Sequence, residues 1–178
     1  MMDYFEKLKI PTFNLYWENY GGFKTIVTSQ YFRISLLLTT LLTIFVVIFG
    51  ESKGWYEHTL NTLPDILGFS IASFAILISL GDNKFRKKLS AEKDSQKSTP
   101  FMIINSSFVH FIFIQIIAIL FALISQILVL KNIIFFFIGM FLLIYAVLLT
   151  LAATLGILQF SLWYQDFLNN EKESKNEH

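Results

Sequence analysis

The chain has 178 residues, of which 54% are hydrophobic, 17% aromatic and only 15% charged. Average globular chains are about 25% charged, so this composition excludes a soluble enzyme, and the abundance of Phe over Pro and Gly excludes a disordered or collagen-like chain. The sequence contains no Cys, which removes disulfide scaffolds, thiol nucleophiles and Cys-ligated zinc.

Four long stretches carry almost no charge, namely residues 31–50, 63–80, 101–130 and 133–163. Each is long enough to cross a bilayer as a helix. The sequence therefore predicts an all-α polytopic membrane protein with four transmembrane helices. We expect an N-terminal arm at residues 1–30, a transmembrane domain at 31–165 and a disordered tail at 166–178.

The Lys and Arg residues are distributed unevenly between the connections. Twelve of the 14 lie in the arm, at the start of the first span (Arg33), in the second connection or in the tail, and only Lys53 and Lys131 lie in the first and third connections. Because positive charge accumulates on the cytoplasmic side, this distribution places both termini in the cytoplasm.

The arm contains a short amphipathic pattern between Pro11 and the glycine pair at 21–22. Pro favours the first helical position and Gly a helix end. Four aromatic residues follow the helical spacing i, i+3, i+4, i+7, which predicts a short helix lying at the membrane interface: Phe13, Tyr16, Trp17 and Tyr20. This helix either anchors the first span or docks a partner.

The second span begins with Pro64 and Asp65, residue types that suit the first turn of a helix. Asp65 is interpreted as a helix-start charge, a cation or proton site at the outer mouth, or a salt-bridge partner. Small residues on the same side predict a helix-packing ridge: Gly68, Ala72, Ala75 and Ser79.

The third span carries a polar stripe that faces protein or water rather than lipid. The candidate intramembrane residues are Ser107, His110, Gln115, Ser125 and Gln126. His110 is interpreted either as a neutral, hydrogen-bonded core residue or as a group for pH sensing or conduction. The sequence offers no nearby ligands for a metal, so no metal site is expected.

Small residues recur on the fourth span, which predicts close helix neighbours: Gly139, Ala146, Thr150 and Ala153. The span has a second small-residue side as well. Because a four-helix protomer has more such faces than it can bury, we expect a homo-oligomer.

The second connection, residues 81–100, concentrates positive charge, including Lys84, Arg86, Lys87 and Lys88. This basic cluster suits contact with anionic lipids or with a cytoplasmic protein. Direct binding of nucleic acid is not expected, because no base-stacking aromatic pattern accompanies the lysines. No catalytic or cofactor-binding motif is present, so neither an enzyme nor a cofactor is expected.

The four-pass plan and the segment LPDILGFS at residues 63–70 resemble the small four-pass membrane proteins of bacterial antiphage systems, notably the KwaA family of Kiwa. The resemblance implies an oligomeric inner-membrane subunit that works with a cytoplasmic partner. Together with the absent catalytic motifs it suggests a non-enzymatic sensor or effector. The alternative is a small ion channel or proton-linked transporter built on the polar stripe.

Overall fold

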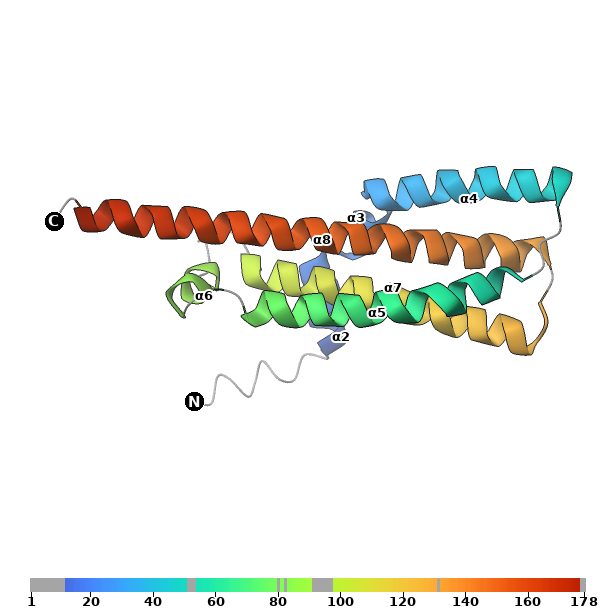
Figure 1. The fold of residues 1–178 in the computed structure, drawn as a ribbon, viewed down its shortest axis with the longest axis horizontal. Coiled ribbons are helices and arrows are strands. Elements are labelled where there is room, and N and C mark those ends of the chain that lie inside the picture. The colour runs from blue at the N-terminus through green and yellow to red at the C-terminus, as the bar shows by residue number, and fades with distance from the viewer. Residues whose placement is uncertain are drawn as a thin grey trace.

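The structure, a computed structural model, describes residues 12–50, 54–79, 81, 83–90, 98–130 and 132–176, with side chains to residue 173. These ranges are helical and contain no strand, as the sequence predicted (Figure 1). In chain order the helices are α2 (Thr12–Tyr20), α3 (Gly22–Thr28), α4 (Gln30–Phe49), α5 (Trp55–Ser79), α6 (Asn83–Leu89), α7 (Pro100–Ile127) and α8 (Ile133–Asn176).

Four helices are long and apolar enough to cross a membrane, namely α4, α5, α7 and α8, with mean hydropathies of 2.3, 1.7, 2.6 and 2.8 over their most apolar stretches. Large apolar side chains cover their outer surfaces, including Phe45, Ile71 and Leu120. Such surfaces are stable against lipid and costly in water. The chain is therefore a multi-pass membrane protein.

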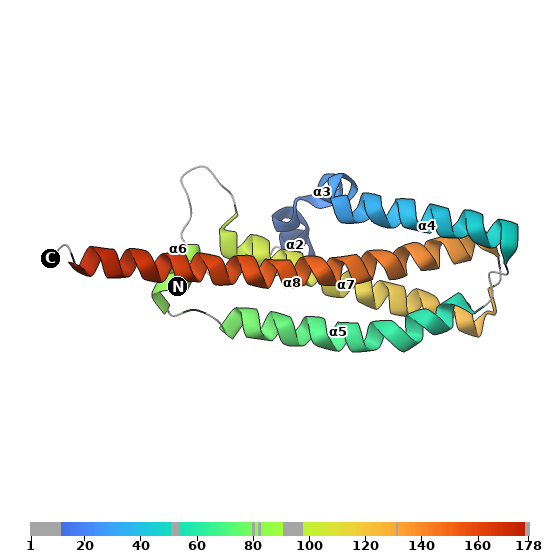
Figure 2. The same ribbon diagram turned by 45° about the horizontal axis from the view of Figure 1, so that its top comes forward.

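Helices α5, α7 and α8 pack on one another, and α4 packs against α8 (Figure 1). The short α2 lies against α7, and α3 leads from it into α4. Figure 2 shows that α8 continues well past the ends of α5 and α7. We call this end of the molecule the projecting end.

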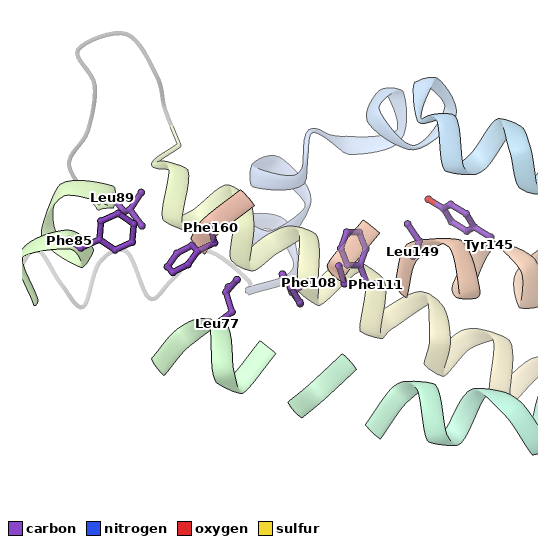
Figure 3. Packing of buried hydrophobic residues seen from close by; sticks show 9 residues of the cluster. Leu77, Phe85, Leu89, Phe108, Phe111, Tyr145, Leu149 and Phe160 are labelled. Carbon is purple, nitrogen blue, oxygen red and sulfur yellow. The ribbon is translucent and has the colours of Figure 1, made fainter. Parts of the chain in front are cut away.

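The largest hydrophobic cluster runs from the middle of the bundle to the projecting end (Figure 3). It joins Leu77 of α5, Phe108 of α7 and Phe160 of α8 to Phe85 and Leu89 of α6. A second cluster at the opposite end is built around Trp55, Ala122 and Phe136, and a third around Leu63, Ala118 and Ala146.

The start of the second span differs from the prediction. Helix α5 begins at Trp55, so Pro64 lies inside the helix and Asp65 is an exposed residue in its middle. An internal Pro costs about 3 kcal/mol through a lost hydrogen bond and a steric clash. Burial of Trp55, only 2% exposed, against Ala122 and Phe136 offsets this cost.

The predicted disorder of the tail is wrong over residues 166–176, because α8 continues through Asn176. Helix α6 lies in the connection at residues 81–100, for which the sequence predicted no helix, and its contacts explain this order. Its Phe85 ring lies 5.3 Å from the ring of Phe167, and Lys84 forms a 3.0 Å salt bridge with Glu171. Tertiary contact therefore orders a segment whose polar composition indicated disorder.

Two glycines provide a matched test of this packing. A Cβ at Gly139 would collide with the Trp55 ring, whereas a Cβ at Gly68 would meet nothing within 4 Å. Ala is the better helix former by about 1 kcal/mol, so Gly68→Ala should leave stability unchanged or raise it. Gly139→Ala should instead lower the free energy of unfolding by about 1–3 kcal/mol. Unfolding in detergent, followed by Trp fluorescence, measures both, and equal effects would contradict the packing.

Candidate functional site

The predicted polar stripe of the third span separates into different environments. His110, Gln115 and Ser125 are buried, Ser107 is half-buried and Gln126 is exposed. The hydroxyl of Ser107 donates to the carbonyl of Ile103 in its own helix. The stripe is therefore not one continuous polar surface, and its buried members are the candidates for a site inside the bundle.

His110 joins the N-terminal arm to the bundle. Its Nδ1 lies 2.7 Å from the Tyr16 hydroxyl of α2, and its Nε2 lies 3.4 Å from the Tyr145 hydroxyl of α8. The Tyr20 ring stacks on the imidazole with centroids 4.0 Å apart. Only 1% of His110 is exposed. The aromatic face of α2 is thus turned toward the protein at this point.

Tyr16 and Tyr145 provide a hydrogen-bond partner for each nitrogen of a neutral His110 imidazole. In the tautomer with the proton on Nε2, Tyr16 donates to Nδ1 and Nε2 donates to Tyr145. Burial, with a smaller effect from neighbouring Tyr20, raises the pKa of Tyr16 to about 12. The Tyr16 hydroxyl therefore keeps its proton at neutral pH and remains a donor. The geometry agrees with the interpretation of His110 as a hydrogen-bonded core residue.

Gln115 bridges three spans. Its Nε2 donates to Ser70 Oγ of α5 at 2.9 Å and to Thr150 Oγ1 of α8 at 2.9 Å. Gln115 and Ser70 are buried, and Thr150 in turn donates to the carbonyl of Ala146. Without water, a polar side chain in a span gains most from partners on neighbouring helices. Gln115 therefore ties α5, α7 and α8 together.

Other buried polar atoms in the described spans have no hydrogen-bond partner there. They include Gln115 Oε1, Ser125 Oγ, Thr39 Oγ1 and Trp55 Nε1. The hydroxyl and indole groups among them are neutral. They supply no set of acid, base and nucleophile.

The predicted small-residue faces have different surroundings. On α8, Gly139, Ala146 and Ala153 are buried within the protomer, and Thr150 is half-buried. On α5 the opposite holds, and the exposed residues are Gly68, Ala72, Ala75 and Ser79. The α8 face is thus used inside the protomer, whereas the α5 ridge is open.

The basic cluster lies on α6, at the projecting end. Lys84 bonds Glu171, Arg86 Nη2 donates to the Ser79 carbonyl at 3.0 Å, and Lys88 Nζ lies 5.3 Å from the Phe167 ring centroid. Lys87 is exposed. These contacts orient α6 against α8, so the positive charge of this helix is presented on a folded element.

No group of three or more metal-ligating side chains occurs within the part of the chain that the structure describes. Two cavities of about 440 Å³ open at the surface. One lies between α3, α4 and α7 beside Tyr20 and Ser107, and the other lies between α6 and α8 beside Lys88 and Asp166. Neither is lined by His110 or Gln115.

Sequence reasoning selected His110 and Gln115 but missed their partners Ser70 and Tyr145 as members of the same clusters. The hydrogen bonds join residues 94, 45 and 35 positions apart. Helical periodicity relates residues only within one helix, so no local signal identifies such pairs.

Comparison with known proteins finds no protein-family model, curated protein or solved structure that matches this chain. Its functional interpretation therefore rests on its own geometry and charge distribution.

The bridge made by Gln115 can be tested against a second glutamine on the same helix. Gln115→Leu keeps the volume and removes both hydrogen bonds, so it should lower the free energy of unfolding by about 1 kcal/mol. Gln126 is exposed, and Gln126→Leu should change the free energy of unfolding by less than about 0.5 kcal/mol. Denaturation in detergent provides the measurement. A Gln115→Leu protein as stable as the parent would show that the bridge contributes nothing.

The docking of the arm depends on the Tyr16 hydroxyl. Tyr16→Phe removes its bond to His110 while keeping the ring, which should speed amide hydrogen exchange in residues 12–20 about fivefold, the effect of about 1 kcal/mol. The control is Tyr56→Phe, at the far end of the bundle. If both variants leave exchange in the arm unchanged, the hydroxyl does not hold α2.

Proposed function

We propose that this protein is a non-enzymatic, oligomeric subunit of the bacterial inner membrane that acts as a sensor or effector and couples to a cytoplasmic protein. The observation that carries the proposal is the folded platform at the projecting end, formed by α6 and residues 160–173 of α8 (Figure 1).

Aromatic packing gives the platform a defined shape. The Phe85 ring lies 5.4 Å from Phe160, 5.0 Å from Tyr164 and 5.3 Å from Phe167. The Lys84–Glu171 salt bridge closes its outer edge. A surface ordered before binding loses less conformational entropy when a partner docks. The platform therefore suits recognition of another protein better than a disordered tail would.

The charge distribution supports a cytoplasmic location for the platform. Lys84, Arg86, Lys87 and Lys88 all belong to α6, and positive charge favours the cytoplasmic face. The partner that fits this surface is a soluble protein with an acidic patch. Anionic lipid headgroups would satisfy the same charges, and the experiment below separates the two.

The polar clusters support a structural rather than a chemical role for the spans. His110 and Gln115 form their hydrogen bonds with residues of other helices. The likeness of residues 63–70 to four-pass antiphage subunits suggests a defence system as the setting. Within that segment Leu63 and Ser70 are both buried.

The alternative function is a small channel or proton-linked transporter. The unpartnered Oε1 of Gln115 and Oγ of Ser125 favour it, because water in a pathway would satisfy both atoms. Ion flux in liposomes that Gln115→Leu abolishes would support this alternative over the proposed function.

The proposed coupling predicts a stoichiometric soluble partner when the protein is purified from mildly solubilised membranes of cells that express its gene neighbourhood. Raising salt should weaken the association, because charge attraction is screened. Lys87→Glu should reduce recovery about fivefold, and Lys24→Glu, on α3, should not. Light scattering of the purified protein should give more than one protomer mass.

Two results would contradict the proposal. One is that correctly inserted protein recovers no stoichiometric soluble partner, and that Lys87→Glu weakens only the binding of the protein to anionic vesicles. The other is a monomer in several mild detergents.

A further inference from the structure

The face of α8 opposite its buried side carries a regular row of leucines. Leu151, Leu155, Leu158 and Leu162 are separated by four, three and four residues, and each is 47–58% exposed. The buried side of the same helix holds Ala146, Leu149, Ala153 and Phe160. Helix α8 therefore has a second apolar face that no described part of the protomer covers.

The surroundings of this row change along the helix. In the first half of α8 the exposed large side chains outside this row are Ile133, Ile134, Ile138 and Val147, as expected of a surface in lipid. From residue 154 onward, exposed polar residues flank the leucines on both sides, namely Thr154, Gln159, Ser161 and Asp166. A narrow apolar stripe with polar flanks is typical of a helix-pairing seam and not of a lipid-facing surface.

The later leucines also lie past the start of α4. Near the beginning of α4, the Phe32 ring lies 5.2 Å from Phe141 and 5.9 Å from Tyr145 of α8. Helix α8 continues from there toward the projecting end, as Figure 1 shows. Leu158 lies about three and a half turns beyond Tyr145 and Leu162 nearly five turns beyond it, so part of the row extends past the level at which α4 enters the bundle.

The same three-and-four spacing continues into polar residues. Gln165 follows Leu162 by three positions and Asn169 follows by four more, and both are exposed. In a parallel helix pair, equivalent positions meet, so each amide would face its own copy. An Asn at such a position specifies register in parallel coiled coils. The next position is Lys172, where like charges would meet, so the seam ends at Asn169.

We propose that α8 pairs in parallel with α8 of a second copy of this chain through a seam of Leu151, Leu155, Leu158, Leu162, Gln165 and Asn169. This inference rests on the oligomer of the proposed function and names its interface. Copies inserted in one membrane with the same topology run in the same direction, so their α8 helices are parallel. A two-fold axis then brings identical residues together, so each leucine of the row would pack against the same leucine of the other copy.

This pairing leaves the platform free. Helix α6 contacts α8 through Phe160, Tyr164 and Phe167, on the side away from the seam. The pair would therefore present two copies of the basic α6 surface, pointing outward, to soluble partners.

The absence of Cys makes single-cysteine cross-linking a clean test. Leu162→Cys and Asn169→Cys place thiols on the seam, and Asn170→Cys places one about 100° away on the same helix. In native membranes treated with an oxidant, the seam variants should form a disulfide-linked species of twice the 20.6 kDa protomer mass. We expect about tenfold more of it than for Asn170→Cys, because disulfides need Cα atoms within about 7 Å.

Equal cross-linking at 169 and 170, or none at 162 and 169, would overturn the seam. Light scattering of the same preparations separates the possible failures. An oligomer without cross-links on the seam leaves the proposed function intact and moves the interface elsewhere. A monomer contradicts both.

Discussion

The arrangement of this protein depends on one physical interaction, the hydrogen bonds that polar donors in the membrane spans form with side chains of neighbouring helices. Gln115 Nε2 donates to Ser70 and Thr150 on two neighbouring helices. Because lipid is as apolar as leucine, burial of apolar surface contributes little to the choice of helix neighbours there. Hydrogen bonds and close packing at small residues decide instead which helices meet.

The same kind of interaction explains the position of the N-terminal arm. His110 is buried, and among the described residues of the spans Tyr145 is its hydrogen-bond partner. Tyr16 supplies the second partner and Tyr20 covers the ring. The arm thus completes a polar site that the bundle leaves open. Phe13 and Phe23 remain largely exposed on it, a surface suited to membrane lipid.

Helix α8 connects the bundle to the projecting end because its two faces differ along its length. Its small residues let Trp55 and the neighbouring helices approach closely in the first half, and its aromatic residues hold α6 in the second half. A helix of 44 residues exceeds the thickness of a bilayer about twofold. Folded structure outside the spans is a consequence of that length, and it gives a membrane protein with small connections a defined surface for partners.

The sequence by itself determined the helical class and the four spans, because hydropathy and helical periodicity act along one segment. Tertiary structure alone decided that α5 starts nine residues before Pro64, that α8 continues past residue 166, and that Tyr16 meets His110. In each case a contact between residues far apart in the chain outweighed a local preference. The contribution of Trp55 or Phe167 to stability depends on the residues that pack against it, and the neighbouring sequence does not identify those residues.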